Sequence, residues 1–417
     1  MRRDHRAAER AARRARRVLM LVENLPVPFD RRVWQEACTL RDAGYAVSVI
    51  CPTGKGHEAL FEDIDGVQVH RYRLPMEADG AAGYMIEYGA ALAQTMRLAW
   101  RVFFRRGFDV IHACNPPDLF FLVGAVFKLF GKRYLFDHHD LCPELYEAKF
   151  GRRDALYRLM ERLERCNYRM ADVAIATNQT YRRIAIERGG MAPERVFVVR
   201  SGPSLARMRL MPPQPALRKG RRFLVGYVGV MGEQEGVDGL LHAVRHIVFD
   251  LGRHDIQFGL VGGGTSLEAL ERMARSLGID EHVSFMGRVS DERMLAVLNT
   301  ADVCVNPDRV NALNDSSTMN KIMEYMALGK PIVQFDLREG RVSAQEASLY
   351  ARRDDVRDFG AKIVELLDDP QRREAMGRFG RRRVETELEW RHEAPRLLAA
   401  YDAIWPVAPL RREAAAP

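Results

Sequence analysis

The 417-residue sequence contains no run of about eighteen apolar residues, which is the length that a membrane-spanning helix requires. No apolar segment follows the basic residues at its start, so a secretory signal is not predicted. No two cysteines form a CxxC pair; the six are Cys38, Cys51, Cys114, Cys142, Cys166 and Cys304. Together these absences predict a reduced, cytoplasmic protein without a membrane-spanning helix or a structural zinc site.

Positive charge is concentrated at the start of the chain. The net charge is +8, and residues 1–17 hold eight arginines against Asp4 and Glu9, so this tail accounts for a surplus of six. Such a tail suits an anionic membrane surface or a nucleic acid. A solvated, frayed helix without a role is the third interpretation that the composition leaves open.

Short apolar strands alternate with helical segments along the whole chain, which favours α/β units with parallel sheets. A polar, proline-rich stretch at residues 201–220 separates two halves of similar organisation. In such sheets, ligands bind beyond the carboxyl ends of the strands. The predicted strands are residues 18–22, 46–51, 67–72, 109–113, 133–136, 173–176, 196–199, 223–228, 256–261, 283–286, 303–305 and 332–335.

Residues 315–336, DSSTMNKIMEYMALGKPIVQFD, join a polar loop, a helix and a buried strand. Ser316, Ser317 and Thr318 can cap the helix, whose first N–H groups also favour an anion. Lys321 lies one turn in. Glu324 shares a face with Asn320, so its carboxylate can accept from a ribose diol. An ordinary capped amphipathic helix remains the alternative.

This segment resembles the signature of family 4 glycosyltransferases, which have the GT-B fold. In that family two glutamates eight positions apart bracket the sugar and ribose of the donor. Glu324 matches the second glutamate, whereas Ser316, beside Asp315, occupies the position of the first. The order of the segments FDRRVWQEACTLRDAG, LFDHHDLCPELY, GYVGVMGEQEGVDGLL, LVGGG and HVSFMGRVS extends the resemblance over residues 18–405.

The resemblance implies a retaining, metal-independent enzyme with two Rossmann-like domains whose parallel sheets face a central cleft. Of the adjacent His138 and His139, it assigns His139 to the transferred sugar; a structural histidine is the other interpretation. No metal is expected there, because adjacent side chains of a strand point to opposite sides. The implied catalytic residues are His139, Asp315 and Ser316. The implied donor-binding residues are Glu324, Lys321, Asn320, Ser317, Thr318, Gly229, Gly232, Gly263, Arg288 and Val289.

The chain departs from the family pattern at the donor diphosphate. Relatives often place an arginine and a lysine after the first strand of the second domain, where this chain has Met231 and Glu235. Lys321 or Arg288 is then expected to balance the phosphates. Arg31 and Arg32 are further candidates, unless Asp30 simply caps a helix and both arginines are solvated.

A second motif resembles a metal site but predicts none. Asp63-Ile64-Asp65 matches the DxD motif of the other large glycosyltransferase fold, yet it precedes Gly66 and an edge-like strand. It is therefore interpreted as a turn.

The expected domains are a basic tail (1–17), an acceptor-side domain (18–203), a donor domain (204–385) and a C-terminal segment (386–417) whose helix packs back on the first domain. The expected reaction transfers a hexosyl or N-acetylhexosaminyl group from a UDP-sugar, or less readily a GDP-sugar, to a glycan or polyprenyl-diphosphate-linked acceptor. Aromatic and basic residues in 83–105 and 118–133 suit the inner face of the cell membrane, although core packing also explains the aromatics. The alternatives are a non-hydrolysing sugar-nucleotide epimerase and a nucleic-acid-binding protein; a near-neutral body argues against the latter.

Overall fold

The computed structural model describes residues 16–74 and 80–405, which form two compact units. Most of the predicted basic tail lies outside the described residues. The first unit contains the residues up to Pro143, Arg153–Val199 and the residues from Ala394 on; the second contains Glu144–Arg152 and Arg200–Glu393. The chain therefore passes between the units at residues 143–144, 152–153, 199–200 and 393–394. The last two positions lie four and eight residues from the expected boundaries at 203 and 385.

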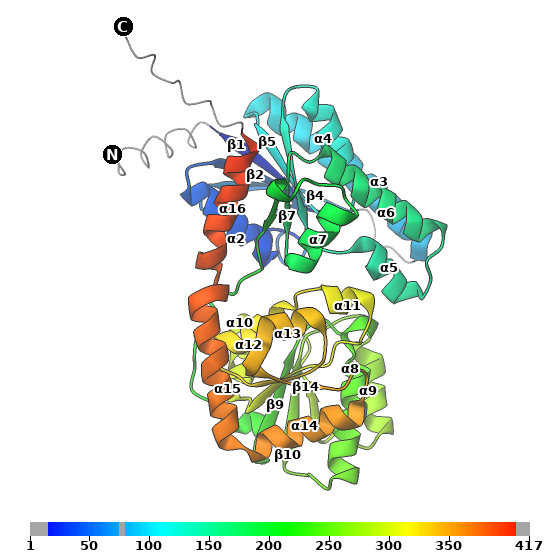
Figure 1. Ribbon diagram of the computed structural model, residues 1–417, viewed down its shortest axis with the longest axis vertical. Helices are drawn as coiled ribbons and strands as arrows, with labels where there is room; N and C mark the ends of the chain where they lie inside the picture. The colour runs from blue at the N-terminus through cyan, green and yellow to red at the C-terminus, as the bar shows by residue number, and fades with distance from the viewer. Residues whose placement is uncertain (1–15, 75–79, 406–417) are drawn as a thin grey trace, which may run out of the picture. The chain divides into compact units, whose positions relative to one another are not determined.

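The first unit is built on an eight-stranded sheet in the order β3-β4-β2-β1-β5-β6-β7-β8, in which only the edge strand β3 is antiparallel to its neighbour. Helices α2 and α3 both pack on β2 and β4 (Figure 1). The strands are β1 (Arg17–Leu21), β2 (Ala46–Pro52), β3 (Phe61–Ile64), β4 (Val67–Tyr72), β5 (Val110–Cys114), β6 (Arg133–His138), β7 (Val173–Ala176) and β8 (Val196–Val198). The α-helices are α2 (Arg31–Asp42), α3 (Gly80–Arg105), α4 (Phe121–Lys128), α5 (Cys142–Phe150), α6 (Ala155–Met170) and α7 (Gln179–Glu187), and α16 (Trp390–Ile404) joins them from residue 394 on.

The second unit is built on a fully parallel six-stranded sheet in the order β11-β10-β9-β12-β13-β14. Its strands are β9 (Phe223–Val228), β10 (Ile256–Val261), β11 (Val283–Phe285), β12 (Val303–Asn306), β13 (Ile332–Phe335) and β14 (Ser348–Ala351). Its α-helices are α8 (Val237–Arg245), α9 (Leu267–Ser276), α10 (Asp291–Thr300), α11 (Ala312–Ser316), α12 (Asn320–Ala327), α13 (Arg338–Ala344), α14 (Val356–Asp368) and α15 (Pro370–Arg383).

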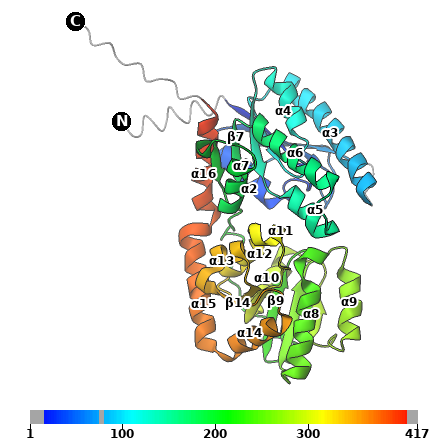
Figure 2. The same ribbon diagram turned by 45° about the vertical axis from the view of Figure 1, so that its right-hand side comes forward.

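Strand residues of the second unit alternate between two hydrophobic clusters. Val225 and Tyr227 of β9 belong to a cluster with α8 and α14, whereas Leu224 belongs to a cluster with α10 and α12. Because successive side chains point to opposite faces, a strand buried on both faces is apolar throughout. Helices thus cover both faces of this sheet (Figure 2).

The structure confirms the predicted fold class of two parallel α/β domains and each of the twelve predicted strands, to within two residues at either end. It adds the strands β3 and β14, which the apolar pattern did not indicate. Asp65 and Gly66 have positive φ and form the turn between β3 and β4, where Asp63 Oδ1 accepts from Gly66 N at 3.0 Å. The DxD-like motif is therefore a hairpin turn, as predicted. In the described part of the chain, no helix combines the length and apolar character needed to cross a bilayer.

Candidate functional site

The first group of candidate residues lies at the carboxyl end of β6. His139 directly follows this strand, and its side chain is 16% exposed. Asp137 lies two residues earlier on the same side of the chain, with its Oδ2 at 2.6 Å from His139 Nε2. His138 points to the opposite side, where its Nδ1 lies 2.6 Å from the hydroxyl of Tyr168 and its Nε2 lies 3.2 Å from Glu164 Oε1. The structural interpretation is therefore correct for His138, whereas His139 lies at the edge of the sheet where ligands bind.

Arg32 extends from the first turn of α2 to this group. Its Nη2 lies 2.9 Å from Asp137 Oδ1 and 3.1 Å from Glu36 Oε1, and its Nη1 donates to Val199 O at 2.9 Å. Asp30 Oδ1 caps the helix by accepting from Val33 N, as the alternative interpretation expected. Arg32 is not solvated but 8% exposed. Since its charge is already matched by a buried carboxylate, the predicted phosphate role of Arg32 has no support in this position. Arg31 is exposed.

Burial and charge set the ionisation of the two carboxyl groups in this network. Burial, reinforced by Asp137, raises the pKa of Glu36 well above its usual value. Burial also acts to raise the pKa of Asp137, but the positive charge of Arg32 and the hydrogen bonds with His112 and His139 outweigh it and hold that pKa well below its usual range. The guanidinium of Arg32 therefore favours the ionised form of Asp137.

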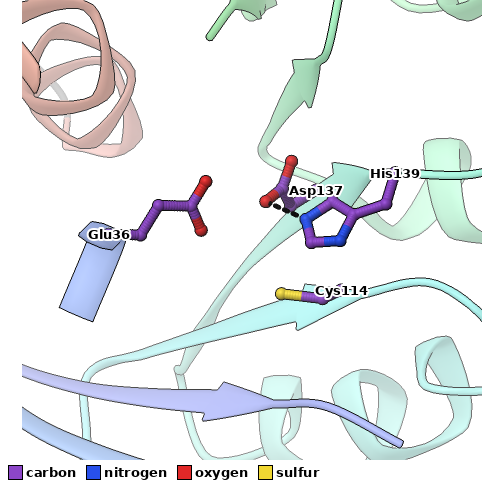
Figure 3. Close-up of side chains that lie close together, drawn as sticks. All are labelled: Glu36, Cys114, Asp137 and His139. Carbon is purple, nitrogen blue, oxygen red and sulfur yellow. Dashed lines mark hydrogen bonds and ion pairs between the residues drawn. The ribbon is translucent and has the colours of Figure 1, made fainter. Parts of the chain in front are cut away.

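Glu36, Cys114, Asp137 and His139 are also residue types that bind metals, and their ligand atoms lie within 4.8 Å of one another (Figure 3). However, the Arg32 guanidinium already contacts three of the four, with its Nε at 2.9 Å from His139 Nε2. A divalent cation would have to displace this permanently charged group. The cluster is therefore better described as an ion-pair network than as a metal site.

In the second unit, α12 is held against the carboxyl ends of two strands. The hydroxyl of Tyr325 accepts from Val228 N at 2.9 Å and donates to Val305 O at 3.2 Å. These bonds place Lys321 and Glu324 at the edge of the sheet where the sequence predicted the donor site. The predicted Ser/Thr cap is wrong, because Met319 precedes the helix and makes no side-chain capping bond.

Lys321 is buried between two carboxylates. Its Nζ lies 2.7 Å from Glu235 Oε2 and 2.7 Å from Asp308 Oδ1. Burial opposes the charge of Lys321, but Asp308, Tyr227 and Glu235 raise its pKa well above the usual value. Burial raises the pKa of Asp308 to about 6. The expectation that Lys321 is the spare cation for the diphosphate is therefore corrected, since Lys321 neutralises the glutamate that stands where relatives carry a lysine.

Glu324 also has a partner within the second unit. Arg207 places Nη1 at 2.9 Å from Glu324 Oε1 and Nε at 2.8 Å from Asp291 Oδ2. The side chain of Glu324 is 15% exposed. A ribose diol that binds the Glu324 carboxylate would therefore either share this carboxylate with Arg207 or displace the Arg207 side chain.

The predicted catalytic residue Asp315 is bound by two arginines of the second unit. Asp315 lies in the last turn of α11 and accepts from Arg338 N at 2.9 Å, and Arg353 Nη2 lies 3.0 Å from its Oδ1. These partners hold the Asp315 carboxylate toward α13 and β14. Ser316, Ser317 and Thr318 are partly buried and Asn320 is exposed. The predicted equivalence of Asp315 and Ser316 to the first glutamate stays a prediction.

The predicted glycines allow two loops to pack closely. Gly229 follows β9 and Gly263 follows β10, and Met231 N donates to Gly263 O at 3.1 Å. A methyl group on Gly262, whose φ is +137°, would lie 1.8 Å from Gly229 O. A methyl group on Gly232 would lie 3.1 Å from Oε1 of Gln234. Much of the need for glycine here is loop packing.

Arg288 and Val289 follow β11. A methyl group on Gly263 would lie 3.3 Å from Cγ of Arg288, so this side chain covers the glycine loop. Arg288 is exposed, and it has no acidic partner among the residues that the structure describes. Of the predicted phosphate-binding residues in this unit, Arg288 is therefore the cation whose charge remains available.

Two family models match the chain in succession. The "Glycosyl transferase 4-like domain" matches residues 30–202, and "Glycosyl transferases group 1" matches residues 222–369. The matches include the β6 network and the α12 site, respectively. The chain belongs to the family 4 glycosyltransferases.

The chain is similar to a curated protein of Corynebacterium glutamicum, the GDP-mannose-dependent monoacylated alpha-(1-6)-phosphatidylinositol monomannoside mannosyltransferase. It is 30% identical over 167 residues, which cover 39% of this chain and 43% of that protein. The match thus spans less than half the length of this curated relative.

Solved structures support the same fold. Sucrose-phosphate synthase from Thermosynechococcus elongatus has a TM-score of 0.75 at 18% identity, with 93% of this chain and 98% of that chain covered. HepE from Anabaena, in complex with UDP-glucose, has a TM-score of 0.70 at 15% identity, with 93% and 99% covered. These likenesses concern the GT-B fold alone.

The site residues that were not predicted include Glu36, Asp137, Arg207 and Asp308. Asp137 had a signal, because residues two apart on a strand share a face and it stands two before His139. Arg207 lies in the proline-rich boundary stretch, and its contact with Glu324 spans 117 residues of sequence, so no local pattern indicated it. Asp308 follows β12 and Lys321 lies in the first turn of α12, so their contact depends on how this strand and this helix pack together.

Proposed function

We propose that this protein transfers a sugar, with retention of anomeric configuration, from a nucleoside-diphosphate donor to a hydroxyl of a lipid-linked glycan in polysaccharide biosynthesis. The observation that carries this proposal is that each family model matches a segment whose candidate site residue lies at the carboxyl end of a sheet. His139 lies at the carboxyl end of the first sheet and Glu324 at that of the second, each inside its family segment. Positioning and electrostatic stabilisation of the leaving diphosphate would supply the catalysis.

The donor is proposed to be a UDP-sugar, bound without a metal ion. Glu324 would accept from the ribose, and the backbone near Val289 would border the base. A GDP-sugar is the competing donor, since the Corynebacterium relative is named as GDP-mannose-dependent, whereas HepE was solved with UDP-glucose.

The direct test is to incubate the protein with each of a panel of UDP- and GDP-sugars and a polyprenyl-diphosphate-linked acceptor, and to analyse lipid products by mass spectrometry. A product heavier by one hexosyl or N-acetylhexosaminyl unit is expected with one donor. Conversion of the donor sugar to its epimer without any acceptor would instead favour the epimerase alternative. Binding of nucleic acid with no sugar turnover would favour the third interpretation.

Arg288 is proposed as the cation that contacts the donor diphosphate. Replacing it with methionine is expected to weaken binding of UDP or GDP by about five- to tenfold, because a charge-assisted hydrogen bond at an exposed position is lost. Affinity for the nucleoside without phosphates should not change. Isothermal titration calorimetry with both ligands measures the difference.

The control for this variant is Arg275→Met, which removes an exposed arginine on α9 of the same unit. Its diphosphate affinity should equal that of the wild type. Equal diphosphate affinity in the Arg288 variant would show that another group balances the phosphates, and Arg31 would be the next candidate.

Peripheral attachment to the inner face of the cell membrane is proposed for a surface at the ends of α3 and α4. Phe104 is 77% exposed, Leu129 85% and Phe130 50%, and Phe104 stacks on Trp100 at 5.4 Å. Arg101 and Arg105 are exposed on the same helix as Phe104. Exposed aromatic rings beside cations suit the interface of an anionic bilayer. In contrast, Phe120 and Phe127 are buried, as the packing interpretation expected.

Deleting residues 1–15 is expected to weaken binding to phosphatidylserine vesicles while turnover on a soluble acceptor analogue persists, because the deletion stops short of β1, which begins at Arg17. Each basic residue contributes roughly 1 kcal/mol at most near such a surface, and salt screens it. Co-sedimentation at low and high salt measures the effect. The double variant Phe104→Ser/Phe130→Ser tests the other contribution. If the deletion leaves vesicle binding unchanged and the serine variant abolishes it, the tail has no part in attachment.

A further inference from the structure

We propose that Asp137 is the positioning residue of His139: it holds the imidazole in the Nε2–H form and leaves Nδ1 as the atom that faces the substrate. This inference rests on the proposed function for its consequence in the reaction. The tautomer itself is a property of the unliganded protein and is testable without any donor or acceptor.

The strand geometry creates the pair. Asp137 is the fifth residue of β6 and His139 follows the strand, so the alternation of side chains puts both on one face. The separation of Asp137 Oδ2 and His139 Nε2 is 2.6 Å, slightly shorter than the roughly 2.7–2.9 Å of charge-assisted N–H···O bonds, so the two groups are in close hydrogen-bonding contact. Asp137 is completely buried, whereas His139 is partly exposed. The carboxylate therefore lies behind the imidazole, and Nδ1 is on the other side of the ring (Figure 3).

Several groups fix the carboxylate in turn. Arg32 Nη2 donates to Asp137 Oδ1 at 2.9 Å, and His112 Nε2 lies 3.3 Å from Oδ2. The hydroxyl of Tyr401 lies 2.8 Å from His112 Nδ1. Burial lowers the pKa of His112, so this ring is neutral and donates through one nitrogen only. The charge of Arg32 holds the pKa of Asp137 well below its usual range, whereas burial raises the pKa of Glu36.

A second contact competes for the same imidazole nitrogen. Arg32 Nε lies 2.9 Å from His139 Nε2, and this nitrogen cannot accept from Arg32 while it donates to Asp137. A bare Nε2 would place a lone pair 2.6 Å from an ionised oxygen inside the protein. With the hydrogen on Nε2, Arg32 Nε can instead donate to Asp137 Oδ2, which is 3.4 Å away. The arrangement with Nε2–H leaves no lone pair facing the buried charge, so it is the more stable one.

The consequence for transfer is a fixed direction of hydrogen bonding. A neutral His139 with Nε2–H presents the Nδ1 lone pair, which accepts a hydrogen bond from a hydroxyl of the donor sugar. The opposite tautomer would present an N–H and could not accept from that hydroxyl. Asp137 and Arg32 therefore act through His139 and need not touch the substrate.

The experiment is nitrogen-15 NMR of the full-length protein labelled at histidine, with the signal of His139 identified from its loss in His139→Asn. We expect a protonated Nε2 and a bare Nδ1 in the wild type. In Asp137→Asn the amide would donate to Nε2, so the hydrogen should move to Nδ1. For transfer by the same variant, kcat should fall by roughly tenfold to hundredfold, while KM for the donor stays near the wild-type value.

The matched control is Glu164→Gln, which removes the buried carboxylate beside His138 on the opposite face of the strand. It should leave the His139 tautomer and kcat unchanged. A wild-type His139 with its hydrogen on Nδ1 overturns the proposal, and this result needs no variant to fold. An unchanged tautomer in Asp137→Asn, or an unchanged kcat, overturns it as well. If the wild type transfers no sugar, the proposed function fails, while the NMR result still decides the role of Asp137.

Discussion

Replacing Lys321 with methionine is expected to lower the free energy of unfolding by about 3–5 kcal/mol, because it leaves the carboxylates of Glu235 and Asp308 without their cation. Asp308 is 1% exposed, so water cannot replace the lost ion pair. Urea unfolding of the full chain, followed by circular dichroism, measures this difference. From the sequence alone, replacing Lys321 was expected to lower the affinity for the donor. The buried ion pairs in the structure instead predict that the main effect is a lower free energy of unfolding.

The loss should shrink as the pH falls. Asp308 has a pKa of about 6 in the folded protein, above the 3.8 of an unperturbed aspartate. Without Lys321 its pKa would rise further, so the folded variant binds a proton that the unfolded chain releases at mildly acidic pH. The stability of the variant must then increase on acidification from pH 7.

Two further variants test this explanation. Lys321→Met/Asp308→Asn should recover much of the lost stability, because the unpaired charge is removed with its partner. Arg272→Met breaks an exposed pair with Glu268 and should cost less than about 1 kcal/mol. A cost for Lys321→Met as small as that of Arg272→Met would contradict the buried-pair interpretation.

Replacing Glu324 with glutamine is expected to weaken donor binding by roughly tenfold to a hundredfold, or about 1.5–3 kcal/mol, with the fold intact. An amide oxygen is a weaker acceptor from a ribose diol than a carboxylate is. Calorimetry with the UDP- or GDP-sugar that the wild type binds measures the change. Unchanged donor affinity would show that Glu324 does not bind the ribose.

The pairing of Glu324 with Arg207 calls for a control. Asp291→Asn removes the other carboxylate that Arg207 contacts and keeps Glu324. If the weaker donor binding of Glu324→Gln came only from disturbing the ion pairs of Arg207, Asp291→Asn would weaken donor binding to a similar degree. We expect its affinity to stay within about twofold of the wild type, since an exposed ion pair contributes little.

Local patterns were sufficient for most of the fold and for part of the site. Strands such as β9 and β10 were predicted with their observed bounds, because strands buried on both faces are continuous apolar runs. The short strand β3, exposed on alternate residues, carries no such run and was missed. Glu324 and His139 were found through the family resemblance and lie at carboxyl strand ends, as the rule for parallel sheets requires.

The sequence by itself determined the α/β class, the two-domain organisation and the membership in family 4, because these follow from hydrophobic periodicity and from motifs read along the chain. It also determined where the family's usual cations are missing, at Met231 and Glu235. What those missing cations mean was decided only by the tertiary structure. Lys321 is bound to Glu235 and Asp308, Arg32 to Asp137, and Arg207 to Glu324. Ion pairs depend on distances between residues that are far apart in sequence, and burial multiplies their effect, so the same charged residue can be a ligand-binding cation or an internal counter-charge.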